Sequence, residues 1–181
     1  SQMEEKQSQY NILGGIEVVG ELDLIALDHA IKTVIDNNRV LLTKYIEDKG
    51  HVTGVVSKEN SFKLEHKVLS FLNAEDKAWR VSAISEEMGA RAFDMSTELP
   101  IDVKVIELGR STFNILVSVH HIASDGWSTG ILLNQIIDAY NCSIEGKDYA
   151  PYQGPDYYDI NSWLSQWFKS DVLEDHVNFW R

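Results

Sequence analysis

The chain has 181 residues, of which 44% are hydrophobic and 24% are charged, as is usual for one globular domain with a substantial core. Its net charge of −12 argues against nucleic acid and anionic membrane surfaces as partners, because both bind basic faces. The single cysteine, Cys142, cannot form an internal disulfide, and no apolar run is long enough to cross a membrane. We therefore expect a cytoplasmic domain that contacts neither nucleic acid nor membrane.

Hydrophobic periodicity predicts strands and helices in alternation along the chain. Gly14-Gly15 is expected to form a bulge in the first strand, and Asp23 is expected to cap the first helix. Trp79 is expected on the buried stripe of the second helix. The predicted strands are residues 10–19, 41–47, 51–57, 62–71, 101–108 and 112–121, and the predicted helices are 24–35, 74–90, 127–140 and a segment from about 156. Hairpins interleaved with helices indicate an α+β fold, a mixed β-sheet covered by helices.

Two adjacent histidines end the last predicted strand. Because side chains alternate along a strand, His121 shares the apolar face of Val117 and Val119, while His120 points to the other face. Desolvation on the apolar face would keep the His121 ring neutral and able to accept a proton near pH 7. Asp125 and Gly126 then close a short loop before the next helix. The pattern predicts proton-transfer chemistry at His121.

Two other interpretations of the histidine pair remain open. In the first, His121 is a hydrogen-bonded core histidine and Asp125 is an ordinary helix cap. In the second, the histidines bind a metal ion. Neighbours on a strand face opposite ways, however, and the sequence contains no cluster with zinc-ligand spacing, so we expect no metal site.

The segment Gly126–Gly130 also matches G-x-S-x-G, the nucleophile elbow of serine hydrolases, with Ser128 as the nucleophile. The partners that chain order allows lie near the end of the sequence: Asp171 or Asp175 with His176. An elbow serine sits directly between strand and helix, whereas here about five loop residues intervene. We therefore favour a helix-capping role for Ser128.

The segment Val119–Ser128 resembles the HHxxxDG signature of condensation domains in nonribosomal peptide synthetases, which belong to the chloramphenicol acetyltransferase-like superfamily. The resemblance extends over residues 1–181 but matches only the amino-terminal lobe of a two-lobed domain. It implies one chloramphenicol acetyltransferase-like lobe, with the second lobe absent and the family's first signature helix cut away. Other segments that are typical of the family are Tyr10–Ile12, Gly20–Asp23, Ala92–Asp94, Leu99-Pro100 and Asn178–Arg181.

The resemblance implies that the intact domain joins an acyl or aminoacyl group to an amine. Both substrates would arrive as thioesters on the phosphopantetheine of donor and acceptor carrier proteins, and no cofactor would be bound directly. With half of the active-site tunnel missing, the isolated lobe would be inactive. The implied roles are catalysis for His121, structural support for His120, Asp125 and Gly126, and the substrate channel for Trp127 and Ser128.

One departure from the family pattern concerns the partner of the motif aspartate. Leu42 occupies the position of an arginine that is expected to pair with this aspartate. Asp125 would then be buried and unpaired unless Arg39, Lys44 or backbone N–H groups at the helix start compensate it. The departure leaves open a catalytically idle lobe that only docks carrier proteins. An epimerization domain shares HHxxxDG, although Trp127-Ser128 after the glycine favours peptide-bond formation.

Overall fold

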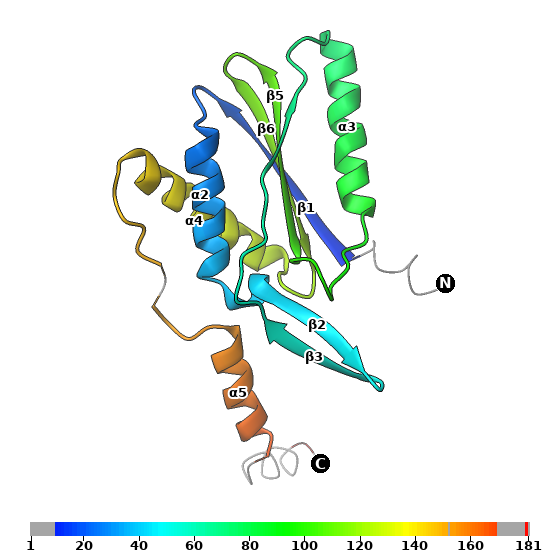
Figure 1. Cartoon of the computed structure of the whole chain (residues 1–181), viewed down its shortest axis with the longest axis vertical. Coiled ribbons are helices and arrows are strands. Elements are labelled where there is room, and N and C mark those ends of the chain that lie inside the picture. The colour runs from blue at the N-terminus through cyan, green and yellow to red at the C-terminus, as the bar shows by residue number, and fades with distance from the viewer. Residues whose placement is uncertain (1–9, 152, 170–179, 181) are drawn as a thin grey trace.

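A computed structural model describes residues 10–151, 153–169 and 180 of the chain. Four strands form the main sheet in the order β1-β6-β5-β4. Their bounds are Asn11–Val19 for β1, Thr112–His120 for β6, Ile101–Gly109 for β5 and Glu65–Val68 for β4. β4 is parallel to β5 and the other pairs are antiparallel, so the sheet is mixed, as predicted. β6 is a central strand with a neighbour along each edge (Figure 1).

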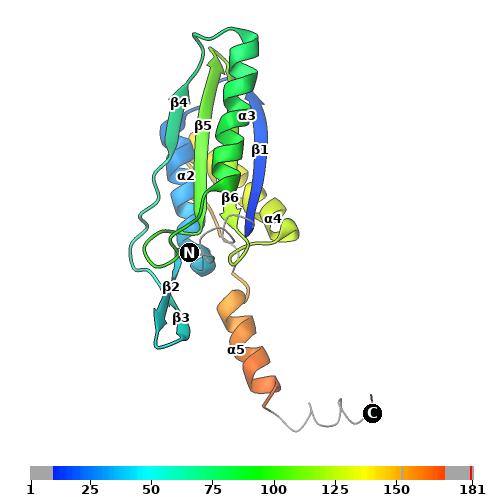
Figure 2. The same cartoon turned by 90° about the vertical axis from the view of Figure 1, so that its right-hand side faces the viewer.

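Helices cover both faces of this sheet, which confirms the predicted architecture. Helices α2 (Leu24–Asp36) and α4 (Gly126–Ile144) lie on one face, and α3 (Ala74–Ala90) lies on the other (Figures 1 and 2). A hydrophobic core lies on each face of the sheet, and alternating side chains of β6 contribute to both. Val117 and Val119 pack with α2 and α4, whereas Leu116 packs with α3.

Capping side chains explain where α2 and α3 begin. The Asp23 carboxylate accepts hydrogen bonds from the N–H groups of Ile25 and Ala26, both at 2.9 Å, as the sequence predicted. The Asn73 side chain accepts from the N–H of Asp76, also at 2.9 Å. Each cap satisfies donors that have no partner inside the helix. The bounds of α3 coincide with the predicted helix 74–90.

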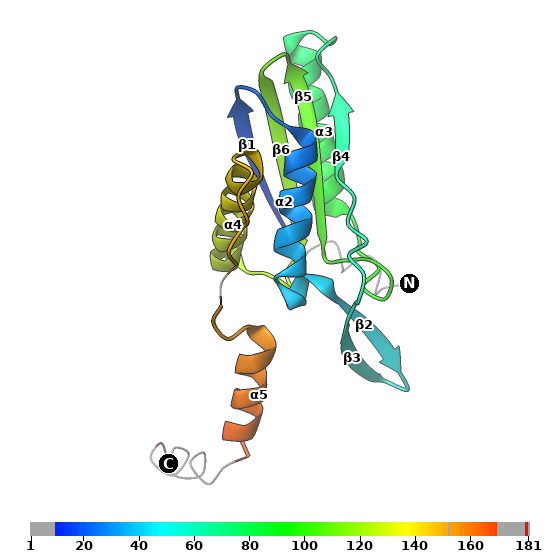
Figure 3. The ribbon, with the colours of Figure 1, turned by 60° about the vertical axis from the view of Figure 1, so that its left-hand side comes forward.

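A second, two-stranded sheet and the last helix project from the same end of the main sheet (Figures 1 and 3). The hairpin joins β2 (Thr43–Asp48) to β3 (His51–Val56), as predicted. Lys49 and Gly50 both have positive φ, at 51° and 82°, which is the conformation that two-residue hairpin turns require. A 3₁₀ helix, η2 (Arg39–Leu42), precedes this hairpin, and α5 (Tyr157–Trp167) follows a long connection from α4.

Four details of the sequence-based prediction are wrong. Gly14 and Gly15 continue the regular ladder opposite Val117 and Leu116, and the register shift lies instead in β5, between Glu107 and Gly109. The strand predicted over residues 62–71 is only four residues long, and α4 continues to residue 144. The Trp79 side chain is 67% exposed, because the buried stripe of α3 passes through Ile84 and Met88.

We predict opposite outcomes for two truncations in α3. Ile84→Ala should lower the free energy of unfolding by about 2–5 kcal/mol, because its side chain is 1% exposed and leaves a cavity against β5 and β6. Trp79→Ala should change it by less than about 0.5 kcal/mol. Urea denaturation of both variants measures the difference. Equal losses of stability in the two variants would contradict the packing described for α3.

Candidate functional site

Two backbone hydrogen bonds fix the histidine pair at the end of β6. The N–H of His120 donates to the carbonyl of Pro100, just before β5, at 2.9 Å. The N–H of His121 donates to the carbonyl of Tyr10, just before β1, at 2.7 Å. The strand end is therefore held from both sides, by residues that directly precede the two neighbouring strands.

His120 lies on the α3 face of the sheet, as the strand alternation predicted. Its ring contacts those of Tyr10 and Phe93, with centroids 6.3 and 6.2 Å away. Its Nδ1 accepts a hydrogen bond from the N–H of Ile122 at 3.1 Å. Burial, and secondarily the neighbouring His121, lower the pKa of His120. The geometry therefore describes a neutral ring with its proton on Nε2, which supports the turn after the strand.

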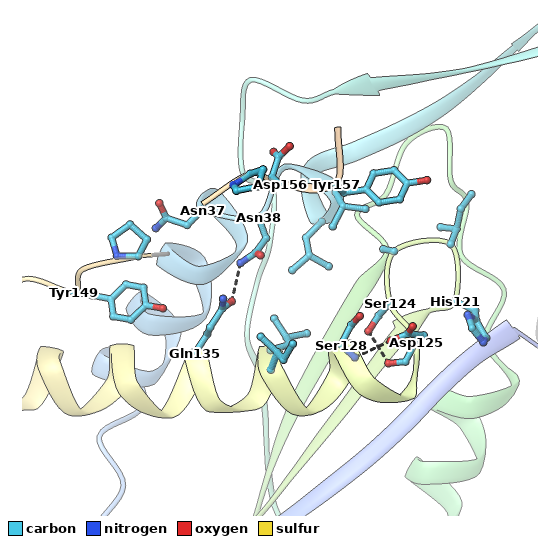
Figure 4. Close-up of a pocket in the computed structure, with 18 residues that line it drawn as sticks. Asn37, Asn38, His121, Ser124, Asp125, Ser128, Gln135, Tyr149, Asp156 and Tyr157 are labelled. Carbon is cyan, nitrogen blue, oxygen red and sulfur yellow. Dashed lines mark hydrogen bonds between the residues drawn. The ribbon is translucent and has the colours of Figure 1, made fainter. Parts of the chain in front are cut away.

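His121 lies on the opposite side of the sheet and borders a cavity of about 550 Å³ (Figure 4). Helix α4 forms one wall of this cavity, and the residues around η2 form another. A third side is lined by Tyr149, Pro151, Pro155, Asp156 and Tyr157. The imidazole itself is exposed. The sequence predicted that His121 would be desolvated on the apolar face of the strand. In the described part of the chain its side chain is exposed, so this prediction is wrong.

Asp125 is the N-cap of α4. One of its carboxylate oxygens accepts from the N–H of Ser128 at 2.7 Å. Hydrogen bonds from the backbone and side chain of Ser128 lower the pKa of Asp125. The carboxylate is exposed, so the burial that would have made it costly does not occur. The sequence left three possible partners for this carboxylate: Arg39, Lys44 and backbone N–H groups at the helix start. The structure shows the last of these.

The residue at the position of the expected arginine belongs to the core. Leu42 is buried in the cluster that α2 and α4 form on the sheet. The guanidinium of Arg39 is engaged elsewhere, because its Nε and Nη2 donate to the Asp156 carboxylate and Nη2 also donates to Asp159 at 3.1 Å. Of the three compensations left open for Asp125, pairing with Arg39 is therefore not the one that the structure shows.

The remaining motif residues occupy the first turn of α4. Gly126 begins the helix, and a Cβ added there would meet no atom within 4 Å, so space is open beside this backbone. Trp127 is 83% exposed, whereas Ser128 lines the cavity. Ser128 thus lies inside a helix turn and not at the strand-to-helix junction that an elbow needs. Its suggested partners, Asp171, Asp175 and His176, lie outside the described residues.

Sequence reasoning missed an ion-pair clasp beside the cavity. Arg39 in η2 holds Asp156 and Asp159 at the start of α5, and its guanidinium lies 5.4 Å from the centre of the Tyr158 ring. The hydroxyls of Tyr158 and Thr43 also share a hydrogen bond. Asp156 caps α5, and the bonds from Arg39 lower its pKa to about 2. The clasp fixes the start of α5 against η2 and so orients one wall of the cavity.

A hydrogen bond between two amides was also missed. Asn38 follows α2, and its Nδ2 donates to Oε1 of Gln135 at 2.9 Å and to the carbonyl of Val34 at 2.8 Å. Both side chains line the cavity, away from the end that His121 borders (Figure 4). Ninety-seven residues separate these partners, so local patterns in the sequence give no sign of the bond.

Two kinds of feature are absent from the part of the chain that the structure describes. No group of three or more His, Cys, Asp or Glu side chains there is arranged to hold a metal ion. None of its helices combines the length and the hydropathy that a membrane span needs.

Comparisons with known proteins agree with this fold. A family model described as "Condensation domain" matches residues 1–181. A linear gramicidin synthase of Brevibacillus parabrevis is 30% identical over 173 residues, which are 95% of this chain and 3% of the synthase. The solved starter condensation domain of rhizomide synthetase matches 99% of this chain at a TM-score of 0.87 and 14% identity. The first condensation domain of the calcium-dependent antibiotic synthetase matches 96% at a TM-score of 0.82 and 18% identity. The chain spans 43% and 42% of those two structures.

We predict that the clasp weakens in acid. The Asp156 pKa lies below its ordinary value, so its contribution to docking of α5 is present above about pH 4 and is lost as pH falls toward 2. Arg39→Met should remove this contribution. Hydrogen exchange of α5 amides, compared between wild type and variant at each pH, should show the largest difference near neutrality and little difference at the acid end.

Lys32→Met is the matched control for this comparison. It removes another exposed cation, which pairs with Asp28 at 2.6 Å within α2. Exchange in α5 should not respond to it. Equal protection of α5 in wild type and Arg39→Met at pH 6 would show that the clasp does not hold the helix.

Proposed function

The chain belongs to the condensation domain family, and from this premise we propose that it is the amino-terminal lobe of a domain that forms amide bonds in nonribosomal peptide synthesis. The lobe assignment is supported by coverage: nearly the whole chain matches solved condensation domains, yet it accounts for less than half of each. The proposed partners are a carboxy-terminal lobe and the donor and acceptor carrier proteins. The substrates are acyl or aminoacyl thioesters on phosphopantetheine, and no other cofactor is required.

In the proposed reaction the amine of the acceptor attacks the thioester carbonyl of the donor. The C–N bond forms as the C–S bond breaks, and the proton lost from the amine ends on the departing thiol. A group that receives or steers this proton has to lie within about 3 Å of the amine. The same group can also stabilise the charge that develops during attack.

The observation that carries the proposal is the placement of His121. Its backbone N–H is bonded to the carbonyl of Tyr10, just before β1, and its exposed side chain borders the cavity. His121 is therefore proposed as the catalytic histidine. His120, held neutral on the other face, and Asp125, the cap of α4, are proposed to support it. The open space at Gly126 would let a substrate approach the backbone.

No observation favours the three alternatives, which are an idle docking lobe, a serine hydrolase and an epimerization domain. The idle docking lobe was suggested by the loss of an arginine at Leu42, but Asp125 is satisfied by the N–H of Ser128 without it. A hydrolase centred on Ser128 lacks the strand–turn–helix context at that residue. Epimerization shares the motif residues, and the product of the intact domain distinguishes it from condensation.

We predict that His121→Ala, introduced into the two-lobed domain, lowers the rate of dipeptide formation by ~10²–10⁴, the usual contribution of a positioned proton-transfer group. The assay is single-turnover condensation between loaded carrier proteins. His51→Ala is the control, because His51 is an exposed residue of the β2–β3 hairpin, away from the cavity. Undiminished product from His121→Ala would exclude the proposed role.

We also predict that the 181-residue chain alone forms no dipeptide. His121 is exposed and one side of the site is open to water, so the amine and thioester are neither held together nor shielded. Addition of the separately produced second lobe should restore product formation. Turnover by the 181-residue chain without that lobe would contradict the two-lobe proposal.

A further inference from the structure

The side-chain amide of Asn11, the first residue of β1, caps the carboxy-terminal end of α3. Its Nδ2 lies 2.6 Å from the carbonyl oxygen of Arg91, 3.2 Å from that of Gly89 and 3.4 Å from that of Met88. The last carbonyls of a helix have no partner inside it, and neither Arg91 nor Ala92 has the positive φ with which helices often satisfy them locally. A side chain from β1 therefore does what a local cap would do, at the point where the two elements meet (Figure 1).

Only the donor half of this amide has partners. Nδ2 carries two protons for the α3 carbonyls, whereas Oδ1 is buried and has no hydrogen-bond partner in the described part of the chain. A buried acceptor without a partner opposes folding, and an apolar side chain of the same shape would avoid that cost. What the amide of Asn11 contributes is therefore its bonds to α3.

The same residue is joined directly to the peptide group that holds His121. The carbonyl that accepts the His121 N–H at 2.7 Å belongs to the peptide unit between Tyr10 and Asn11. This unit is planar, so the direction of the carbonyl follows the position of the Asn11 Cα. Asn11 also lies opposite His120 in the β1–β6 ladder. An anchor on Asn11 is thus one rigid peptide unit and one hydrogen bond away from His121.

This end of β1 is one that would otherwise open readily. β1 lies at an edge of the main sheet, and Asn11 is its first residue. The ends of such elements open at little free-energy cost, and opening here would withdraw the Tyr10 carbonyl from His121. The bonds to α3 make opening harder, because they have to break as well. α3 is itself fixed on the sheet by the buried side chains of Ile84 and Met88.

We infer that Asn11 is a positioning residue for His121: its amide ties the start of β1 to the end of α3 and so keeps the Tyr10 carbonyl on the His121 N–H. Asn11 does not line the cavity, so it acts through the strand end and not on a substrate. A displaced His121 leaves the substrate-binding walls unchanged, but an error of about 1 Å in its position can lower the rate by ~10². The catalytic part of this inference rests on the proposed function, whereas the anchor itself does not.

The anchor is tested by amide hydrogen exchange in the 181-residue chain, which needs neither a second lobe nor a substrate. In Asn11→Ala and in Asn11→Leu, protection of the His121 amide should fall about tenfold, as expected for the loss of one or two hydrogen bonds. Asn11→Leu keeps the shape of the side chain, so it separates lost hydrogen bonds from lost packing, and it serves alone if Asn11→Ala does not fold. Unchanged protection of His121 in Asn11→Leu would overturn the inference.

The amide of Gly20 is the internal reference for this measurement. It donates to the carbonyl of Ser111 at 2.9 Å, at the opposite end of the β1–β6 pair, and should keep its protection in both variants. An equal loss at Gly20 and His121 would mean that the substitutions loosen the whole sheet, and it would count against a local anchor.

The effect on the reaction is measured in the two-lobed domain. Asn11→Leu should lower kcat for dipeptide formation by ~10–100-fold and leave KM for the acceptor within about twofold, because position is lost and binding is not. Asn73→Ala is the matched control: it removes the asparagine cap at the other end of α3 and should leave both constants unchanged. Equal losses of kcat in the two variants, or a raised KM with normal kcat in Asn11→Leu, would contradict a positioning role.

The two proposals can fail independently. A large loss of product in His121→Ala together with normal kcat in Asn11→Leu overturns the inference and leaves the proposed function standing. Undiminished product from His121→Ala contradicts the proposed function, and the exchange measurement then decides by itself whether Asn11 anchors the strand end.

Discussion

The arrangement of this fold depends on the pairing of β6 along both of its edges. A slip of one residue against β1 or β5 would send Val117 and Val119 out of the core and turn His121 toward α3. The apolar surface that these residues bury opposes such a slip. The burial that stabilises the sheet therefore also decides which histidine faces the cavity. No additional interaction is needed to choose between two adjacent and identical side chains.

Much of the fold could be predicted because its signals are local. Asp23 caps the helix that follows it, the Lys49-Gly50 turn joins adjacent strands, and alternation in β6 spans nine residues. The opposite orientations of His120 and His121 follow from that alternation alone. Features of this kind are fixed by residues within one turn or one strand of each other, so the pattern of neighbouring residues is enough to find them.

The features that escaped prediction depend on partners far along the chain. Arg39 meets Asp156 across 117 residues, although the sequence alone leaves Asp125 open as a partner for the same guanidinium. Trp79 has an apolar side chain at a plausible helical spacing, but α3 turns Ile84 and Met88 to the sheet and leaves Trp79 outside. In each case the sequence supplies the correct residue type, and only the packing of distant elements decides its partner.

The environments of His121 and Asp125 differ in how much of the proposed site this chain provides. Asp125 finds its partner within this chain, whereas His121 is exposed and would need a second lobe to exclude water. The charge of Asp125 is stabilised within α4, by the N–H of Ser128, so the turn that carries the motif is complete without a distant cation. His121 is held in place by its backbone but remains in water. Electrostatic interactions with a reacting amine strengthen when water is excluded. Under the proposed function, this chain would therefore supply the geometry of the reaction centre, and the proposed second lobe would supply its low dielectric.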